Sequence, residues 1–192
     1  MKRALIISVM AAAVAFCVAC DDGNEAFPDP AFKACIENRL AQYSDIYDTT
    51  YNINNEKDLE VVGLLSCSDA GIKSIEGVEK LLNLNDLRLY KNQIESIEPI
   101  RDLEKLQDLD LSFNKIKDVE PISDAVKITY LQLSANYITD IRSLKTLVAM
   151  GVLYLDDNCI SDISSQCETL TTAISGLTIY GEENQMDPQR CQ

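Results

Sequence analysis

Histidine and tryptophan are absent from the 192-residue chain, and only seven glycines occur in it. Histidine is the side chain most often used for proton transfer near neutral pH and for binding metals. Its absence excludes Ser–His and Cys–His nucleophile pairs and every metal site that needs an imidazole. The glycines form neither G-x-G-x-x-G nor a Walker A sequence, so no phosphate-binding loop is predicted.

The acidic residues offer no convincing replacement chemistry. The run Asp156-Asp157-Asn158 begins like a calcium loop, but the glycine and the final glutamate of such a loop do not follow. Glu182, Glu183 and Asp187 are typical of a solvated tail. Asp108 and Asp110 are a pair of acids of the kind that glycosidases use, yet a flat sheet offers no pocket that would raise one pKa. We therefore predict no enzyme activity, no catalytic residue, no metal and no cofactor.

Basic residues are also scarce, with 17 Lys and Arg against 31 Asp and Glu, a formal charge of −14. This excess of negative charge argues against nucleic acid as a partner, because phosphates require Lys and Arg. It argues equally against a module held on a membrane surface by charge. The charge is typical of a well-solvated surface, and a basic partner is the alternative.

What the chain does contain is a repeat, clearest in residues 109–119, which read L-x-L-x-x-N-x-I-x-x-V. The first leucine of this motif recurs every 22 residues, and a period in the twenties indicates a solenoid. The leucines in this register are Leu65, Leu87, Leu109, Leu131 and Leu153. The five units are 59–80, 81–102, 103–124, 125–146 and 147–168.

The aligned units share apolar columns that fail only at Gln166. The L-x-L pair alternates, so it predicts a short strand with both leucines pointing inward, and the other apolar columns point inward from the returning segment. A single unit buries only one side, so units must stack, and their strands then pair in parallel.

One polar column also points inward: Asn92, Asn114, Asn136 and Asn158, with Ala70 in the first unit. A buried amide is costly unless its hydrogen bonds are made. We predict that these asparagines bond to neighbouring backbone and have a structural role.

Residues 116–122, Ile-Lys-Asp-Val-Glu-Pro-Ile, resemble the I-x-D-I-x-P-L segment of the 22-residue leucine-rich repeats typified by bacterial internalins, and residues 94–100 match it as well. Residues 27–36 resemble the helical cap of such proteins. The resemblance implies an α/β solenoid that is curved, with short parallel β-strands on the concave face, 3₁₀ segments and loops on the convex side, and an N-terminal α-helical cap. It also implies protein binding rather than catalysis.

Residues 1–19 read as a signal peptide, with Lys2 and Arg3 before an apolar run. The run ends in Cys17-Val18-Ala19-Cys20, which resembles a bacterial lipobox. We predict lipidation at Cys20, a tether over 20–29 and attachment to a membrane of the bacterial cell envelope, on its periplasmic or surface side. Cleavage by signal peptidase I before Cys20, giving a secreted protein, is the alternative.

Both ends of the solenoid need caps. Asp29 before Pro30 predicts a helix start, and apolar spacing predicts an amphipathic helix over 30–43, within an N-terminal cap of 30–58. The five repeats occupy 59–168. Residues 169–192 hold a sixth strand at Leu177 and Ile179, with two residues inserted into the repeat spacing, and a C-terminal cap.

Cysteines predict how the caps are fixed. Cys35 faces inward from the cap helix and Cys67 occupies an inward position of the first strand, so the two are well placed for a disulfide. The chain-entropy effect of closing this loop is about 3–4 kcal/mol; two buried thiols are the alternative. Resemblance to bacterial repeat proteins with a cysteine in the last coil implies Cys159–Cys191, with Cys167–Cys191 as the alternative.

The outward strand positions are free to carry specificity. Tyr and Arg are frequent interface hot spots. Packing between neighbouring strands, on a sheet that binds no partner, would also explain Tyr and Arg at these positions. The predicted binding face comprises Arg88, Tyr90, Asp108, Asp110, Phe113, Tyr130, Gln132, Val152 and Tyr154. We predict a monomeric, non-catalytic cell-envelope protein that binds a protein ligand through this concave face. The alternative is a surface adhesin or structural envelope lipoprotein that contacts host or neighbouring cells.

Overall fold

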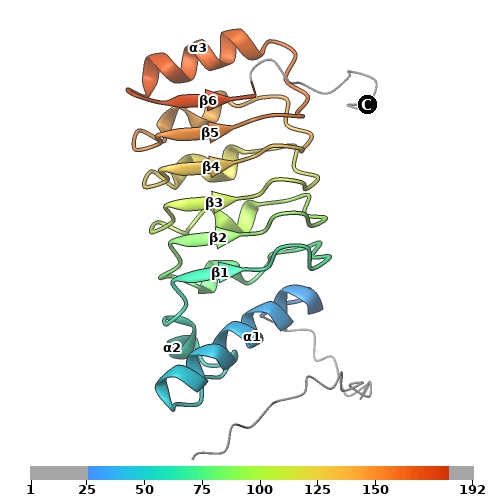
Figure 1. Ribbon diagram of the computed structural model, residues 1–192, viewed down its shortest axis with the longest axis vertical. Coiled ribbons are helices and arrows are strands. Elements are labelled where there is room, and N and C mark those ends of the chain that lie inside the picture. The colour runs from blue at the N-terminus through green and yellow to red at the C-terminus, as the bar shows by residue number, and fades with distance from the viewer. Residues whose placement is uncertain (1–25, 182–192) are drawn as a thin grey trace, which may run out of the picture.

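The computed structural model describes residues 26–181, which form a solenoid with a six-stranded parallel sheet along one side (Figure 1). The strands follow one another in sequence order, so every strand pairs with the one before it and the one after it. The predicted fold class is confirmed: a curved α/β solenoid with its short strands on the concave face. The strands are β1 Leu64–Ser66, β2 Asp86–Arg88, β3 Asp108–Asp110, β4 Tyr130–Gln132, β5 Val152–Tyr154 and β6 Thr178–Tyr180.

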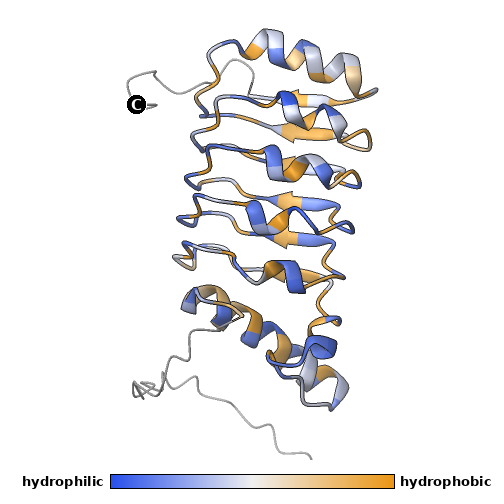
Figure 2. Cartoon of the chain, turned by 180° about the vertical axis from the view of Figure 1, so that it is seen from behind, coloured by the Kyte–Doolittle hydropathy of each residue, from blue (hydrophilic) through white to orange (hydrophobic). Residues whose placement is uncertain are grey.

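The register of the first five strands follows the repeat. Leu87 lies between Leu65 and Leu109 in the sheet, and Leu131 continues the row. The returning segments form 3₁₀ helices on the opposite side, visible in Figure 2. Prolines stand in the first turns of η2 and η3, where their fixed φ favours a helix start. The segments are η1 Val78–Lys80, η2 Glu98–Ile100, η3 Glu120–Asp124 and η4 Arg142–Thr146.

Between the two sides lies one continuous apolar core. In the third unit, Leu109, Leu111, Ile116 and Ile122 are fully buried. Equivalent residues fill the other coils, so the core runs from the N-terminal cap to the last helix. Replacing Leu111 with a smaller residue would open a cavity that neither neighbouring coil could fill.

The asparagine column bonds to backbone, as predicted. Asn114 Nδ2 donates to the carbonyls of Leu89 and Leu111 at 3.0 and 2.9 Å, and its Oδ1 accepts from the Ile94 amide at 3.0 Å. Asn136 repeats the pattern one coil further on, donating to Leu111 at 3.0 Å. Each asparagine therefore ties its own coil to the preceding one.

The N-terminal cap is helix α1, Pro30–Tyr47, which covers the first coil with Phe32 and Ile36 buried. Asp29 caps it as predicted, accepting from the Ala31 and Phe32 amides at 2.9 and 3.0 Å. The helix is one turn longer than the predicted 30–43 and is followed by the C-cap residue Asp48, which has left-handed backbone. A short second helix, α2 Glu56–Leu59, falls in the predicted loop and turn.

Asp29 also fixes the cap to the first coil, because its second oxygen accepts from the Lys73 and Ser74 amides at 2.8 and 3.1 Å. Partial burial raises the pKa of Asp29, but the backbone hydrogen bonds, led by the one from Lys73, outweigh burial and lower it. A disulfide joins Cys35 to Cys67 across the same junction, with an S–S distance of 2.02 Å.

The C-terminal end departs from the prediction. Helix α3, Ile163–Ala173, replaces the expected 3₁₀ segment, and Ile179 rather than Leu177 pairs with Leu153. The insertion is therefore four residues (179 − 153 = 26, against 22), not two. An α-helix rises only about 1.5 Å per residue, less than a 3₁₀ helix, so it needs more residues to cross the same side of the coil.

Gln166, where the apolar column fails, lies buried in α3. Its side-chain oxygen accepts from the Ile141 amide at 2.8 Å, so this polar residue performs a bonding task like that of the asparagines. Cys159 is disulfide-bonded and Cys167 is buried. The signal peptide, Cys20 and the predicted partner Cys191 lie outside the described residues, as do residues 182–192. Within residues 26–181, no helix has the length and apolarity to cross a membrane.

Candidate functional site

The candidate site is the outward surface of the parallel sheet. Strand pairing places the first outward positions in one row and the second in another. The first row is Leu64, Asp86, Asp108, Tyr130, Val152 and Thr178. The second is Ser66, Arg88, Asp110, Gln132, Tyr154 and Tyr180. The surface is thus charged over β2 and β3 and aromatic over β4 to β6.

The aromatic part consists of Tyr130, Tyr154 and Tyr180 on three successive strands, and we call these three side chains the tyrosine row. The rings of Tyr130 and Tyr154 are 5.7 Å apart and tilted by 57°, whereas Tyr154 and Tyr180 are stacked at 4.7 Å with an interplanar angle of 13°. Partial burial, together with nearby Tyr130 and Tyr180, raises the pKa of Tyr154. Tyr180 is absent from the predicted face, because the assumed two-residue insertion assigns it to a different row.

The charged part contains one closed ion pair. Arg88 Nε and Nη2 donate to the two carboxylate oxygens of Asp86 at 2.9 and 2.7 Å. This bidentate hydrogen bond and the charge of Asp86 raise the pKa of Arg88, with smaller contributions from Asp108 and Asp110. Asp110 accepts from the Ser112 amide at 3.0 Å and from the Ser112 hydroxyl.

A shallow hollow of about 400 Å³ opens in this charged part. Its lining brings together five of the predicted binding-face residues. Its walls are Asp86, Arg88, Asp108, Leu109, Asp110, Tyr130 and Gln132.

Tyr90 and Phe113 form a second aromatic contact, with ring centroids 5.2 Å apart in an edge-to-face arrangement. Phe113 is 50% exposed and has a φ of 57°, in the left-handed region. This conformation recurs at Asp69, Lys91, Ala135 and Asp157, the equivalent turn positions of the other coils. The structure therefore divides the predicted face into a tyrosine row and a separate Tyr90–Phe113 pair.

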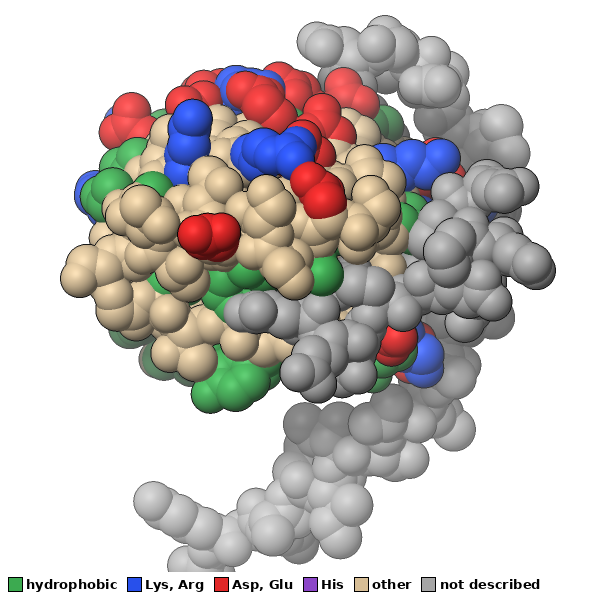
Figure 3. Space-filling model, turned by 90° about the horizontal axis from the view of Figure 1, so that it is seen from above, with side chains coloured by type: hydrophobic (Ala, Val, Ile, Leu, Met, Phe, Trp, Pro, Cys, Tyr) green, Lys and Arg blue, Asp and Glu red, His purple; other side chains and the backbone are tan. Residues whose placement is uncertain are grey.

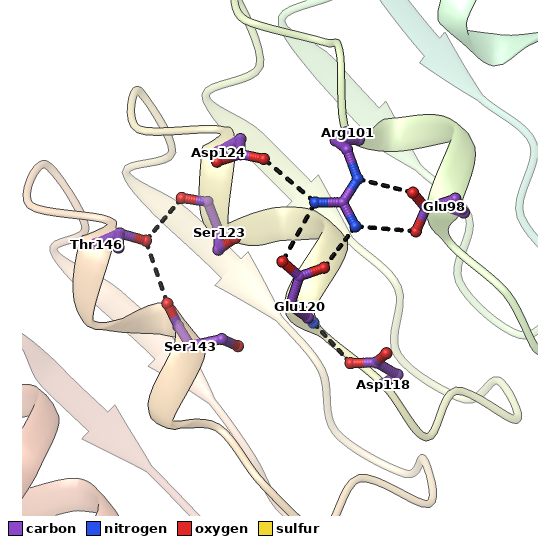
Figure 4. A network of polar contacts seen from close by, with 8 residues as sticks. All are labelled: Glu98, Arg101, Asp118, Glu120, Ser123, Asp124, Ser143 and Thr146. Carbon is purple, nitrogen blue, oxygen red and sulfur yellow. Dashed lines mark hydrogen bonds and ion pairs between the residues drawn. The ribbon is translucent and has the colours of Figure 1, made fainter.

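The convex side is different, because its arginines are paired with acidic neighbours. Figure 4 shows Arg101 at the centre of a network: it donates to Glu98 at 2.7 Å, to Glu120 at 2.5 Å and to Asp124 at 3.3 Å. Hydrogen bonds to Glu98 and Glu120 raise the pKa of Arg101. Thr146 extends the contacts to the next segment by donating to the Ser123 carbonyl at 2.6 Å. Viewed along the solenoid, acidic and basic side chains gather on one side of the molecule (Figure 3).

The part of the chain that the structure describes holds no group of three or more His, Cys, Asp or Glu side chains suited to a metal ion. The convex hollow beside Lys73 and Lys115 is lined by Pro99 and by charged and polar residues, among them Glu76 and Glu95.

The 22-residue coils, their parallel strands and the asparagine column define a leucine-rich repeat fold. In agreement, a family described as "Leucine Rich repeats (2 copies)" matches residues 83–124 and again 104–146.

Two solved structures show the same fold. An internalin of Listeria monocytogenes is 24% identical with a TM-score of 0.66, covering 84% of this chain and 52% of its own. A leucine-rich repeat protein of Leptospira interrogans is 25% identical with a TM-score of 0.58, covering 68% of this chain and 34% of its own. The chain thus spans about half and about one third of these proteins. No curated protein matches it.

Proposed function

We propose that this protein is a non-catalytic, lipid-anchored module of the bacterial cell envelope that binds another protein through its concave face. The observation that carries the proposal is the chemical character of that face. Tyr130, Tyr154 and Tyr180 stand in a row beside Asp108 and Asp110, on a sheet that has no other layer over it among the described residues. Solenoids commonly use their extended concave surface for binding, and tyrosine is a frequent interface hot spot.

The convex side supports the choice by contrast. Arg101 and Arg142 are bonded to acidic neighbours on the convex side, Arg142 to Asp140 and Asp162 at 2.8 and 2.5 Å. A partner would have to break these pairs before it could use the charges. The exposed rings of the concave face need no such rearrangement, because they already present apolar area to solvent.

Anchoring at Cys20 would hold the domain near its membrane, since the tether of residues 20–29 spans at most about 30 Å. Intact mass spectrometry of the mature protein tests this part: a diacyl or triacyl mass at Cys20 is expected, and an unmodified Cys20 indicates secretion. Protease treatment of intact cells then separates the periplasmic location from surface display as an adhesin, because only the displayed protein is digested.

Capture of envelope proteins tests the binding face. The variant Tyr130→Ala/Tyr154→Ala should recover at least tenfold less of the partner, a loss equivalent to about 1.4 kcal/mol. The matched control is Val126→Ala/Val148→Ala, which removes two exposed apolar side chains outside the sheet. Unfolding midpoints of both variants should stay close to that of the wild type. Equal recovery by all three proteins would refute the proposed face.

A further inference from the structure

We infer that the concave face takes a basic segment of its partner, with a Lys or Arg side chain in the hollow between Asp108, Asp110 and Tyr130 and a neighbouring apolar side chain on the tyrosine row. This inference rests on the proposed function and adds the chemistry of the partner. Its first support is charge. Arg88 is held by both oxygens of Asp86, so that pair is neutral, and Asp108 and Asp110 leave two negative charges in the lining of the hollow.

Asp108 and Asp110 are the two outward side chains of one strand, β3, so their negative charges lie close together. The Asp108 carboxylate is exposed and forms no ion pair within residues 26–181. A cation from a partner would relieve this repulsion, whereas an acidic partner would increase it.

The wall of the hollow also suits a long basic side chain. The Tyr130 ring lines the hollow and is tilted by 57° to the ring of Tyr154 rather than stacked on it. Such a ring can accept the aliphatic stem of Lys or Arg, or the cation itself. Gln132 donates to the Tyr130 hydroxyl and fixes that side chain at the edge of the hollow.

A carbohydrate is the main competing occupant, because sugars bind to open tyrosine faces. Here Tyr154 and Tyr180 cover each other, with ring centroids only 4.7 Å apart. Their remaining edges present apolar contact area together with neighbouring Val152, which fits a branched or aromatic side chain of a peptide. The aromatic part is also uncharged, so the acidic and apolar contacts are separated along the face.

That separation predicts a spacing in the partner. The hollow is centred on β3 and the tyrosine row on β5, two strand spacings apart, or about 10 Å. An extended chain covers this distance in about three residues, and alternate residues point to the same side. The basic and apolar side chains of the partner should therefore lie two to four residues apart.

The test uses fluorescein-labelled peptides and the full mature protein, with fluorescence anisotropy as readout. The probes are three copies of Arg-Ser-Leu-Ser and three copies of Glu-Ser-Leu-Ser, and the arginine peptide alone should bind. Asp108→Asn/Asp110→Asn should weaken binding about tenfold. The matched control Glu76→Gln/Glu95→Gln removes two exposed charges from the convex hollow and should change binding less than twofold.

Equal weakening in both double variants would show diffuse charge attraction and overturn the inference, as would binding that neither variant alters. Binding of chitohexaose that Tyr154→Ala abolishes, with no binding of the arginine peptide, would overturn it in favour of a carbohydrate. Far-UV circular dichroism checks that each variant is folded. If the tyrosine variant loses partner capture while the aspartate variant keeps it, the proposed function stands and this inference fails. If neither loses capture, both fail.

Discussion

Alanine substitutions in the asparagine column should destabilise the protein to different degrees, even where the asparagines are equally buried. Asn92 and Asn114 are about equally buried, at 8% and 6% exposure. Their surroundings differ because the first unit has Ala70 where the later units have an asparagine. We predict that Asn92→Ala destabilises the protein more than Asn114→Ala.

The magnitude follows from counting the groups that lose their partners. When Asn114 becomes alanine, the carbonyls of Leu89 and Leu111 each keep a bond from the neighbouring asparagine, at 2.9 and 3.0 Å. The Ile94 amide is then the group left without its 3.0 Å acceptor. One unsatisfied buried group costs about 1–3 kcal/mol, so the expected loss is about 2 kcal/mol.

Asn92→Ala leaves more groups without partners. The Cys67 carbonyl loses its 2.9 Å donor with no asparagine before it as a substitute, and the Ala70 and Ile72 amides lose their acceptor at 3.1 and 3.0 Å. The Ala70 amide can bond to water because Ala70 is exposed. Two buried groups remain, and the expected loss is about 4 kcal/mol.

Urea unfolding followed by circular dichroism measures both values. Asn38→Ala is the matched control, because Asn38 is exposed on α1 and its replacement by a good helix former should cost nothing. A loss for Asn114→Ala equal to or larger than that for Asn92→Ala would refute the idea that neighbouring asparagines share carbonyls.

Three further predictions concern single positions. The pKa of Asp29 is lowered from its ordinary 3.8, so the ionised carboxylate stabilises the fold above that pH, and this stabilisation is lost as the pH falls through the lowered pKa. The difference in unfolding free energy between wild type and Asp29→Asn should therefore disappear when both are measured at increasingly acidic pH. Gly77→Ala should lower the free energy of unfolding by about 2 kcal/mol, measured by thermal unfolding, because φ is 98° and the new Cβ would lie 2.2 Å from the Ala26 carbonyl oxygen. The control Gly151→Ala should leave the free energy of unfolding unchanged, because its new Cβ would lie 3.7 Å from the nearest atom outside the adjacent residues. Ala135→Gly should raise the free energy of unfolding by about 1 kcal/mol, because φ at this position is 56°, where glycine is not strained. An unfolding free energy below that of the wild type would contradict left-handed strain at Ala135.

Periodicity predicts the regular coils because one chemical requirement, an inward leucine, fixes each strand. Leu65 through Leu153 lie in one row, and no competing alignment keeps every leucine buried. The same periodicity predicts the inward asparagines, while the Asp29 cap follows from local sequence, an aspartate before a proline at a helix start.

The C-terminal prediction fails where the period changes. Ile163, Cys167, Leu170 and Ile174 recur at helical spacing, a signal that identifies α3 when read apart from the repeat. Because α3 adds four residues rather than two, Tyr180 pairs with Tyr154 and joins the binding face. The sequence indicates which side chains point outward, but the closed Asp86–Arg88 pair and the Tyr154–Tyr180 stack depend on rotamers, which periodicity does not encode.

The asparagine bonds give the solenoid a direction. The Ile94 and Ile116 amides are each satisfied by an asparagine 20 residues further along the chain, so every such coil is completed by its successor. A ribosome delivers the chain from its N-terminus, and each coil must therefore wait for the next one to emerge before its backbone is fully bonded. Co-translational folding should therefore lag synthesis by one coil through the regular part of the solenoid.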